Sequence, residues 1–345
     1  MSWQIKSRGW KTERPPRKIL IMRFQALGDV VITLPYIQGL KKAYPATQLH
    51  FLTRAEVCEI PMALDLFQEV FVIRGGRSSK LQFLHALTLL PRLLTKRYEV
   101  VIDLQNHWIS RFMRKTVNPK AWSEFDRVSK RSAGERTRLT IEAAGFAGIN
   151  IQPAFHHSPE ISQRATQLLN EAGWDGSSWL VGLNPAGNFD SRNWPIENYV
   201  EWAKLWKMAY PHSQFVLMLT RQHETKARRL KEELNNACID LSDKTSQAMA
   251  FAMVSRLKFM LSEDSGLMHM AWSQGVTTLA LFGSSRSDWA APQGVWSAHY
   301  DSSDLACGPC MLPVCKFGDN RCLTRLSPQQ VFEKADAMWK RQVNA

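Results

Sequence analysis

Acidic, hydroxyl and imidazole side chains gather in one short stretch of the sequence. Asp264, Ser265 and Gly266 separate an apolar run from a helix-like pattern that contains Leu267 and His269. The start of a helix has free N–H groups and the positive end of the helix dipole, which together favour a phosphate. The Asp264 carboxylate can accept hydrogen bonds from hydroxyls, and His269 can donate one to an anion. Hydroxyls combined with phosphate indicate a sugar nucleotide.

The surrounding residues predict the elements that would position these groups. Residues 259–261 form an apolar strand, Gly275 ends the helix, and residues 277–282 form a second strand. Parallel pairing of the two strands would make a right-handed crossover, with its turn at the sheet edge where α/β proteins bind ligands. The alternative is that Asp264 and Ser265 only cap the helix and that His269 is a core residue.

A similar strand, turn and helix occur near the start of the chain. Residues 18–22 predict a strand, residues 24–29 a turn, and Val30 the start of a helix that tolerates Pro35 only in its first turn. Gly28 lets the backbone approach a ligand closely. Asp29 stands at the helix start, where it either acts on a substrate or merely caps the helix.

A third loop follows the predicted strand 179–183. Gly187 and Asn188 are expected to expose backbone amides, and Arg192 can bind a diphosphate through two hydrogen bonds, while Pro195 starts a helix. The loop 242–246 follows a short strand and is expected at the same sheet edge, where Thr245 would flank a nucleobase.

All of the excess positive charge lies in the first half of the chain. Residues 1–150 carry 25 Lys and Arg against 12 Asp and Glu, whereas residues 151–345 carry 19 of each, which gives the net charge of +13. Such a half-molecule indicates a polyanionic partner, either nucleic acid or an anionic membrane surface. Against nucleic acid, the basic residues are not interleaved with an aromatic platform, and no helix-turn-helix or zinc-finger spacing occurs.

The sequence predicts a cytoplasmic protein. It contains no uninterrupted run of 18 or more apolar residues, and residues 1–18 lack the apolar core of a signal peptide. Residues 80–96 predict a basic-rimmed amphipathic helix, interrupted by Pro91, with more leucines than one face needs. This helix either packs on a sheet or lies on a membrane.

Four of the six cysteines lie close together, in the spacing C-x2-C-x4-C-x6-C: Cys307, Cys310, Cys315 and Cys322. In a cytoplasmic protein such thiolates suggest a structural zinc before they suggest disulfides. The spacing is tighter than that of a usual paired zinc ribbon, so the pattern leaves both a zinc site and free thiols open.

Motifs D-S-G-L-M-H, A-x-x-x-G-V and L-F-G-S, between residues 264 and 284, resemble the donor-site signature of glycosyltransferase family 9, the bacterial lipopolysaccharide heptosyltransferases. The Leu-Gly-Asp turn at residues 27–29 and the Trp-Pro pair at residues 194–195 match the same family in the same order. Where many relatives have Lys next to the Trp, this chain has Arg192-Asn193. The resemblance spans nearly the whole chain from Lys18 onward.

The resemblance implies an α/β protein of GT-B architecture, with two Rossmann-like βαβ domains facing a central cleft. Residues 1–160 would form the basic, acceptor-binding domain, joined by the C-terminal helix 327–345. Residues 161–326 would form the domain that binds the nucleotide sugar. The boundary is expected in a stretch rich in Pro, Gly and Ser, between residues 145 and 179.

By this resemblance, the donor is ADP-heptose and the acceptor is the lipid A-linked inner core of lipopolysaccharide, on the inner face of the inner membrane. Transfer would invert the anomeric centre without a metal or other cofactor, and the sequence contains no D-x-D tripeptide. Two alternatives remain: a family 9 transferase that uses another nucleotide sugar, and a basic nucleic-acid-binding protein.

The candidate residues then take separate roles. The donor site would contain Gly187, Asn188, Arg192, Thr245, Asp264, Ser265, Gly266, Leu267 and His269. Gly28 and Arg111 are expected to face the acceptor. An inverting transfer needs a base that takes the proton of the attacking hydroxyl. The candidate is Asp29, and Asp103, at the end of the predicted strand 100–104, is its rival.

Overall fold

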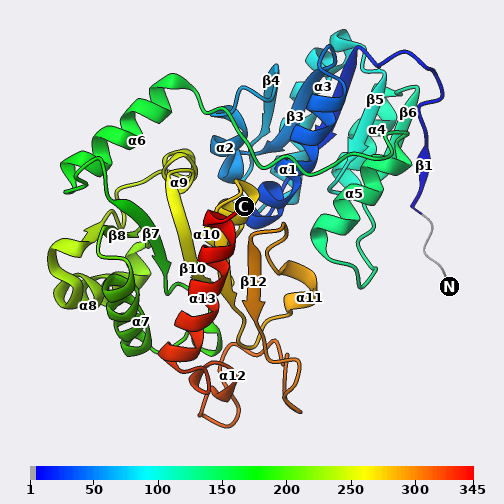
Figure 1. Cartoon of the computed structure of the whole chain (residues 1–345). Helices are drawn as coiled ribbons and strands as arrows, with labels where there is room; N and C mark the ends of the chain where they lie inside the picture. Colours follow the sequence, from blue (N-terminus) through cyan, green and yellow to red (C-terminus); the bar gives the residue numbers. More distant parts are fainter. Residues whose placement is uncertain (1–4) are drawn as a thin grey trace. The chain divides into compact units, whose positions relative to one another are not determined.

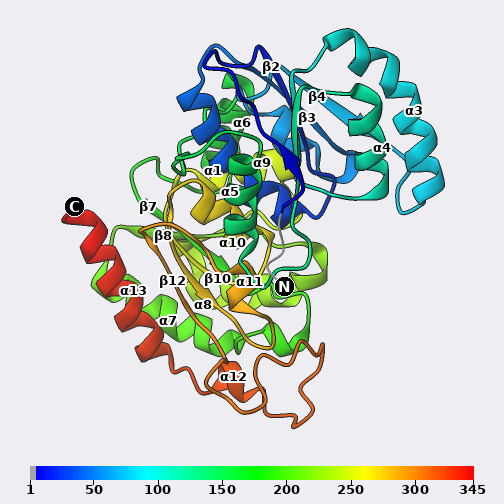
Figure 2. The ribbon, with the colours of Figure 1, turned by 90° about the vertical axis from the view of Figure 1, so that its right-hand side faces the viewer.

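The structure, a computed structural model, describes residues 5–345 and divides the chain into two compact units, one ending at Ser158 and one running from Pro159 to Ala345. Each unit is built on its own six-stranded sheet with helices on both faces (Figures 1 and 2). The predicted α/β class, with two Rossmann-like units, is confirmed. The division lies after Ser158, where the sequence analysis placed it after residue 160.

The sheet of the first unit has the strand order β1-β6-β5-β2-β3-β4. The strands are β1 (Ser7–Arg8), β2 (Lys18–Met22), β3 (Gln48–Arg54), β4 (Glu69–Ile73), β5 (Val100–Asp103) and β6 (Ala121–Glu124). All pair in parallel except β1, which pairs antiparallel with β6 at the edge. The central strands are buried on both faces, which explains why they are continuous apolar runs.

Two pairs of helices cover this sheet, one pair on each face (Figure 2). The pairs are α3 (Ser79–Lys96) with α4 (Trp108–Val117), and α1 (Leu27–Ala43) with α5 (Ala133–Ala143). The short helices η1 (Ala55–Val57) and α2 (Glu59–Met62) connect β3 to β4.

Two of these helices differ from their prediction at a proline. α1 begins at Leu27, so the Leu-Gly-Asp segment is its first turn and Pro35 lies in its interior. α3 runs without interruption through Pro91. An interior proline removes one helical hydrogen bond. α1 is buried continuously from Val30 to Ile37, and this tertiary burial outweighs the local cost.

The sheet of the second unit is wholly parallel, in the order β12-β11-β10-β7-β8-β9. Its strands are β7 (Trp179–Asn184), β8 (Ser213–Leu217), β9 (Cys238–Asp240), β10 (Leu257–Glu263), β11 (Thr277–Leu281) and β12 (Ser297–Tyr300). On one face lie α6 (Pro159–Glu171), α9 (Gln247–Val254) and α10 (Gly266–Ser273), and on the other lie α7 (Ile196–Ala209), α8 (Glu224–Leu234) and α13 (Pro328–Val343). The connections contain η2 (Asp190–Arg192), η3 (Arg221–His223), η4 (Asn235–Ala237), α11 (Ser287–Ala290) and α12 (Arg321–Thr324).

The C-terminal helix α13 corrects one expectation, because it belongs to the second unit and not to the first. It packs beside α7 (Figure 1), where the Trp339 ring lies 5.4 Å from that of Trp179 and 6.4 Å from that of Trp206. The apolar face of α13 thus completes the aromatic core of this unit. No helix among residues 5–345 is long and apolar enough to cross a membrane.

Candidate functional site

In both sheets the chain order reverses beside a central strand. β2 lies between β3 and β5, and β7 lies between β8 and β10. The loops that follow these neighbouring strands therefore start side by side at the carboxyl edge of each sheet. Such switch points are where open α/β sheets bind ligands. Asp29 lies at the switch point of the first unit, and Arg192 and Asp264 lie at that of the second.

The Asp29 carboxylate uses only one of its oxygens for contacts within the protein. Its Oδ2 accepts a hydrogen bond from the backbone N–H of Ala26 at 3.1 Å and lies 2.8 Å from Nη2 of the buried Arg23. No described residue donates a hydrogen bond to Oδ1, and 38% of the side chain is exposed. Asp29 thus stabilises the start of α1 through Oδ2, while Oδ1 stays available to a substrate hydroxyl.

Asp103, the rival base, is completely buried. Its carboxylate accepts hydrogen bonds from the N–H groups of Gln105 at 3.1 Å and Asn106 at 2.8 Å, and from Ser110 Oγ at 2.9 Å. Burial raises the pKa of Asp103 to about 6. This side chain organises the loop between β5 and α4 and has no surface for a substrate.

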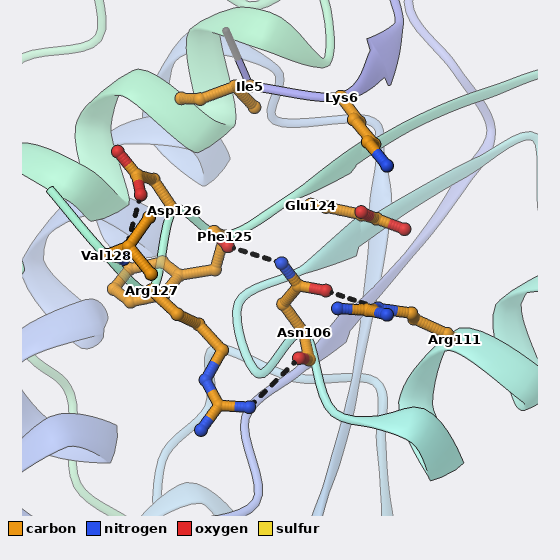
Figure 3. A pocket seen from close by; sticks show the side chains of 9 residues that line it. All are labelled: Ile5, Lys6, Asn106, Arg111, Glu124, Phe125, Asp126, Arg127 and Val128. Atoms are coloured by element: carbon orange, nitrogen blue, oxygen red, sulfur yellow. Dashed lines mark hydrogen bonds between the residues drawn. The ribbon is translucent and has the colours of Figure 1, made fainter. Parts of the chain in front are cut away.

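Arg111 lies on the exposed face of α4, beside a pocket of about 400 Å³ (Figure 3). Its Nε donates to Asn106 Oδ1 at 2.7 Å, which orients the guanidinium. Gly28 lies half-buried in the first turn of α1 and does not line this pocket. The two residues expected at the acceptor therefore lie at different places on the first unit.

In the second unit, two of the predicted donor residues are in direct contact. Arg192 Nη1 lies 3.1 Å from Asp264 Oδ2, and both side chains are mostly buried. Ser265 caps α10 through its hydroxyl, which accepts from Met268 N at 3.5 Å and from Asn184 Nδ2 at 2.6 Å. Gly266 and Leu267 form the first turn of this helix, whose N–H groups have no partner inside the helix.

Glu263, the last residue of β10, is an organising residue that the sequence analysis missed. Its carboxylate is fully buried and accepts from the backbone N–H of Gly187 and of Trp194, each at 2.6 Å. It thereby holds both ends of the loop after β7 against the neighbouring strand. The sequence could have indicated its burial, because alternate residues of a strand face the same side of the sheet and Glu263 follows the buried Phe259 and Leu261 at this spacing.

This arrangement differs from the expectation at Gly187. Its amide is not exposed, because it donates to Glu263 and also to Asn193 Oδ1 at 3.1 Å. A Cβ at this position would come within 2.7 Å of the Cβ and the carbonyl oxygen of Arg192. The glycine is therefore required for close packing of the loop, whereas Asn188 is exposed at its tip.

His269 and Thr245 complete the set of predicted donor residues. His269 is 94% buried in α10, and its Nδ1 accepts a hydrogen bond from Trp272 Nε1 at 3.1 Å, as the core-residue alternative predicts. Thr245 lies in the loop between β9 and α9. Because β9 and β10 run parallel in the same sheet, this loop and the start of α10 lie at the same edge of that sheet.

The four clustered cysteines line a hollow of about 360 Å³ in the segment after β12, and all four are free thiols. Across residues 5–345, no group of three or more His, Cys, Asp or Glu side chains is arranged to hold a metal ion. The segment contacts the loop after β7, because Ser191 N donates to the Pro313 carbonyl at 3.3 Å and Cys322 Sγ donates to the Ser191 carbonyl at 3.9 Å.

Comparison with protein families gives a match to the model described as glycosyltransferase family 9 (heptosyltransferase), over residues 86–320. Among curated proteins, the chain is 24% identical to lipopolysaccharide heptosyltransferase 1 of Pseudomonas aeruginosa, over 93% of this chain and 98% of that protein. It is 19% identical to the lipopolysaccharide core heptosyltransferase OpsX of Haemophilus influenzae, over 77% of this chain and 79% of that protein.

Solved structures share the fold over nearly the whole chain. The family 9 glycosyltransferase from Veillonella parvula superposes with a TM-score of 0.79 at 18% identity, covering 94% of this chain and 98% of that one. The E. coli heptosyltransferase WaaC with ADP gives a TM-score of 0.68 at 18% identity, covering 93% of this chain and 99% of that one.

Proposed function

Because this chain belongs to glycosyltransferase family 9 and is thus a glycosyltransferase, we propose that it transfers heptose from ADP-heptose to the lipid A-linked inner core of lipopolysaccharide. The names of the relatives support this donor and acceptor class: they include lipopolysaccharide heptosyltransferases and a heptosyltransferase with bound ADP-2-deoxy-2-fluoro heptose. The observation that carries the proposal is the Arg192–Asp264 pair, which lies at a switch point beside the start of α10.

The donor diphosphate binds between Arg192 and the first turn of α10, Gly266 and Leu267. A guanidinium has five N–H donors, so Arg192 keeps several for phosphate oxygens while Asp264 holds it in place. Asp264 also accepts from sugar hydroxyls, and Thr245 flanks the nucleobase. Arginine and helix amides together neutralise the departing diphosphate, so the transfer needs no metal ion.

Asp29 acts as the base of an inverting transfer. Its Oδ1 takes the proton of the acceptor hydroxyl while the hydroxyl oxygen bonds to the anomeric carbon and the bond to the diphosphate breaks. Arg23 holds Oδ2 at 2.8 Å, which fixes the orientation of the carboxylate. The acceptor binds to the basic first unit, in the cytoplasm at the inner face of the membrane.

A transfer assay with purified protein tests this function. ADP-heptose and a lipid A-linked acceptor should give a product whose new anomeric centre is inverted, at a rate that EDTA leaves unchanged. ADP-glucose serves as the control donor. Faster transfer from ADP-glucose would identify a family 9 enzyme with another donor, and a strict requirement for a divalent ion would contradict the proposed neutralisation by Arg192 and α10.

A further inference from the structure

The N-terminal strand β1 adds basic residues to one edge of the first sheet. It lies outside the segment that matches the family, residues 86–320, and pairs with β6. Glu124 N donates to the Lys6 carbonyl at 3.0 Å, which continues this pairing by one residue. Lys6 is thereby fixed opposite the C-terminal half of α4.

Two adjoining hollows lie between β1, β6 and α4, with volumes of about 400 and 420 Å³. Both are lined by Lys6, Arg111 and Glu124, and the two adjoining hollows together are called the trough below. Figure 3 shows the first hollow, with Glu124 between Lys6 and Arg111 and with the Arg111 side chain directed toward Asn106.

The trough is lined by six basic side chains against two carboxylates, Glu124 and Asp126: Lys6, Arg8, Arg111, Arg114, Lys115 and Arg127. Glu124 is neutralised by an ion pair with the buried Arg114, whose guanidinium also lies 3.9 Å from the centre of the Trp122 ring. Lys6, Arg111 and Lys115 form no ion pair with any residue in the described range 5–345. Like charges that face one space repel each other, and a bound anion would remove this repulsion.

One of these cations is held in position before any ligand arrives. Arg111 Nε donates to Asn106 Oδ1, and Asn106 Nδ2 donates to the Phe125 carbonyl at 2.7 Å (Figure 3). This chain of contacts leaves the planar Nη edge of Arg111 for a ligand. Such an oriented fork matches the two oxygens of a phosphate or carboxylate.

The trough lies close to the candidate base. The ring of Phe125, which lines the first hollow, stacks under the guanidinium of Arg23 at 4.8 Å, and Arg23 binds Asp29. Phe125 and Arg23 thus link the first hollow to Asp29, and we expect an acceptor with one hydroxyl at Asp29 to bring an acid group of a neighbouring sugar to the hollow.

We propose that β1 completes a subsite for a phosphate or carboxylate group of the acceptor saccharide, with Lys6, Arg111 and Lys115 as its charged ligands. This inference rests on the proposed function for the identity of the acceptor. It assigns the N-terminal segment a role in recognising the acid group of the acceptor, at a distance from the transferred sugar.

Calorimetry with a deacylated, lipid-free inner-core saccharide that keeps its acid groups tests the subsite. Lys6→Gln should weaken binding about tenfold, because one charge-assisted hydrogen bond is lost. Lys11→Gln is the matched control, since Lys11 is an exposed lysine of the same segment that does not line the trough. The same saccharide after removal of its phosphates and reduction of its carboxylates should bind both variants and the wild type equally weakly.

Three results would overturn the subsite: equal binding by the two variants, no discrimination between charged and neutral saccharide, or an effect of Lys6→Gln only on binding to phosphatidylglycerol vesicles. The last result would assign the trough to lipid headgroups. Binding that depends on Lys6, in a protein that transfers no heptose, would refute the proposed function and leave the subsite standing. Normal transfer with binding that does not depend on Lys6 would refute the subsite and leave the proposed function standing.

Discussion

At the scale of single residues, Asp29 and Asp103 show how similar positions in the sequence acquire different roles. Asp103 ends strand β5 and Asp29 lies in the helix after strand β2, and both accept hydrogen bonds from nearby backbone N–H groups. Asp103 is closed off by three donors and has no exposed surface, whereas Asp29 is only partly covered. A base must reach its substrate, so burial distinguishes the two carboxylates where residue type does not.

Asp29→Asn should fold, bind ADP-heptose and transfer heptose about 10²- to 10⁴-fold more slowly, because an amide cannot take the proton. Because the asparagine oxygen can still accept from the Ala26 N–H, the free energy of unfolding should fall by only about 1 kcal/mol. Single-turnover kinetics and calorimetry with the donor measure these quantities.

Asp103→Asn is the matched control. It should lower the free energy of unfolding by about 1–3 kcal/mol, because a buried hydrogen-bond network loses an acceptor, while turnover per folded molecule stays near normal. Near-normal turnover in Asp29→Asn, together with loss of turnover in Asp103→Asn, would assign the base to Asp103.

At the scale of elements, the loop between β7 and α7 depends on its neighbour β10. Glu263 accepts from both ends of the loop, and Lys226 reaches the same loop through Pro185 O and Asn193 Oδ1, each at 2.7 Å. Arg192 is therefore positioned by a buried carboxyl that itself touches no ligand in the proposed function. Burial raises the pKa of Glu263 from its usual 4.5 to about 8.

The pH dependence of stability should reveal Glu263. Its pKa is higher in the folded than in the unfolded state, so its contribution is fully present below pH 4.5 and is lost as the pH rises toward 8. Glu263→Gln does not titrate and should flatten the profile in this window. It should also cost about 1–3 kcal/mol of unfolding free energy, because its NH₂ group faces a backbone N–H.

Urea unfolding at several pH values between 4.5 and 8.5 measures the free energy of unfolding and its pH profile. The donor KM at pH 7 measures the effect on donor binding. The exposed Glu232→Gln on α8 is the control and should change neither. A profile of Glu263→Gln parallel to that of the wild type would show that this carboxyl does not titrate in the window.

At the scale of the whole molecule, the unit that carries the net charge also has a helix with several exposed leucines. The first unit carries the whole net charge of +13. Its helix α3 buries Ala86, Leu90 and Leu93 against the sheet and leaves four other leucines 37–58% exposed: Leu81, Leu84, Leu87 and Leu94. One face of this helix therefore packs on the sheet, as the first alternative predicts, and contact of the exposed leucines with a membrane stays a prediction.

The double variant Leu81→Ser and Leu84→Ser should bind phosphatidylglycerol vesicles about thirtyfold more weakly, because each exposed leucine loses roughly 1 kcal/mol of apolar burial. Binding should also weaken as salt rises, because anionic lipid attracts the basic unit electrostatically. Co-sedimentation measures both effects. Met208→Ser, at a 75% exposed methionine of the second unit, should change nothing. Equal losses in the two proteins, or retention at high salt, would argue against this surface.

The sequence by itself determined the class of fold and the family resemblance, and it predicted the residues of a candidate donor site. Continuous apolar runs predicted the buried parallel strands, and Gly, Pro and acidic residues marked the turns at their carboxyl ends. These signals are local, because a strand buried on both faces must be apolar along its length and a helix start favours capping residues. The difference in net charge between the two halves also follows directly from the numbers of acidic and basic residues.

Tertiary structure decided which of these residues meet and which are covered. Only in the folded protein does Glu263 accept from the Gly187 N–H and does Arg192 pair with Asp264. Likewise, only the fold buries Asp103 completely while Asp29 Oδ1 keeps no partner among the described residues. Pro35 and Pro91 stayed inside helices, and α13 joined the second unit, because packing against distant residues outweighs a local preference worth a few kcal/mol. Long-range contacts of this kind leave no periodic signal in a single chain, so they appear only once the strands are placed side by side.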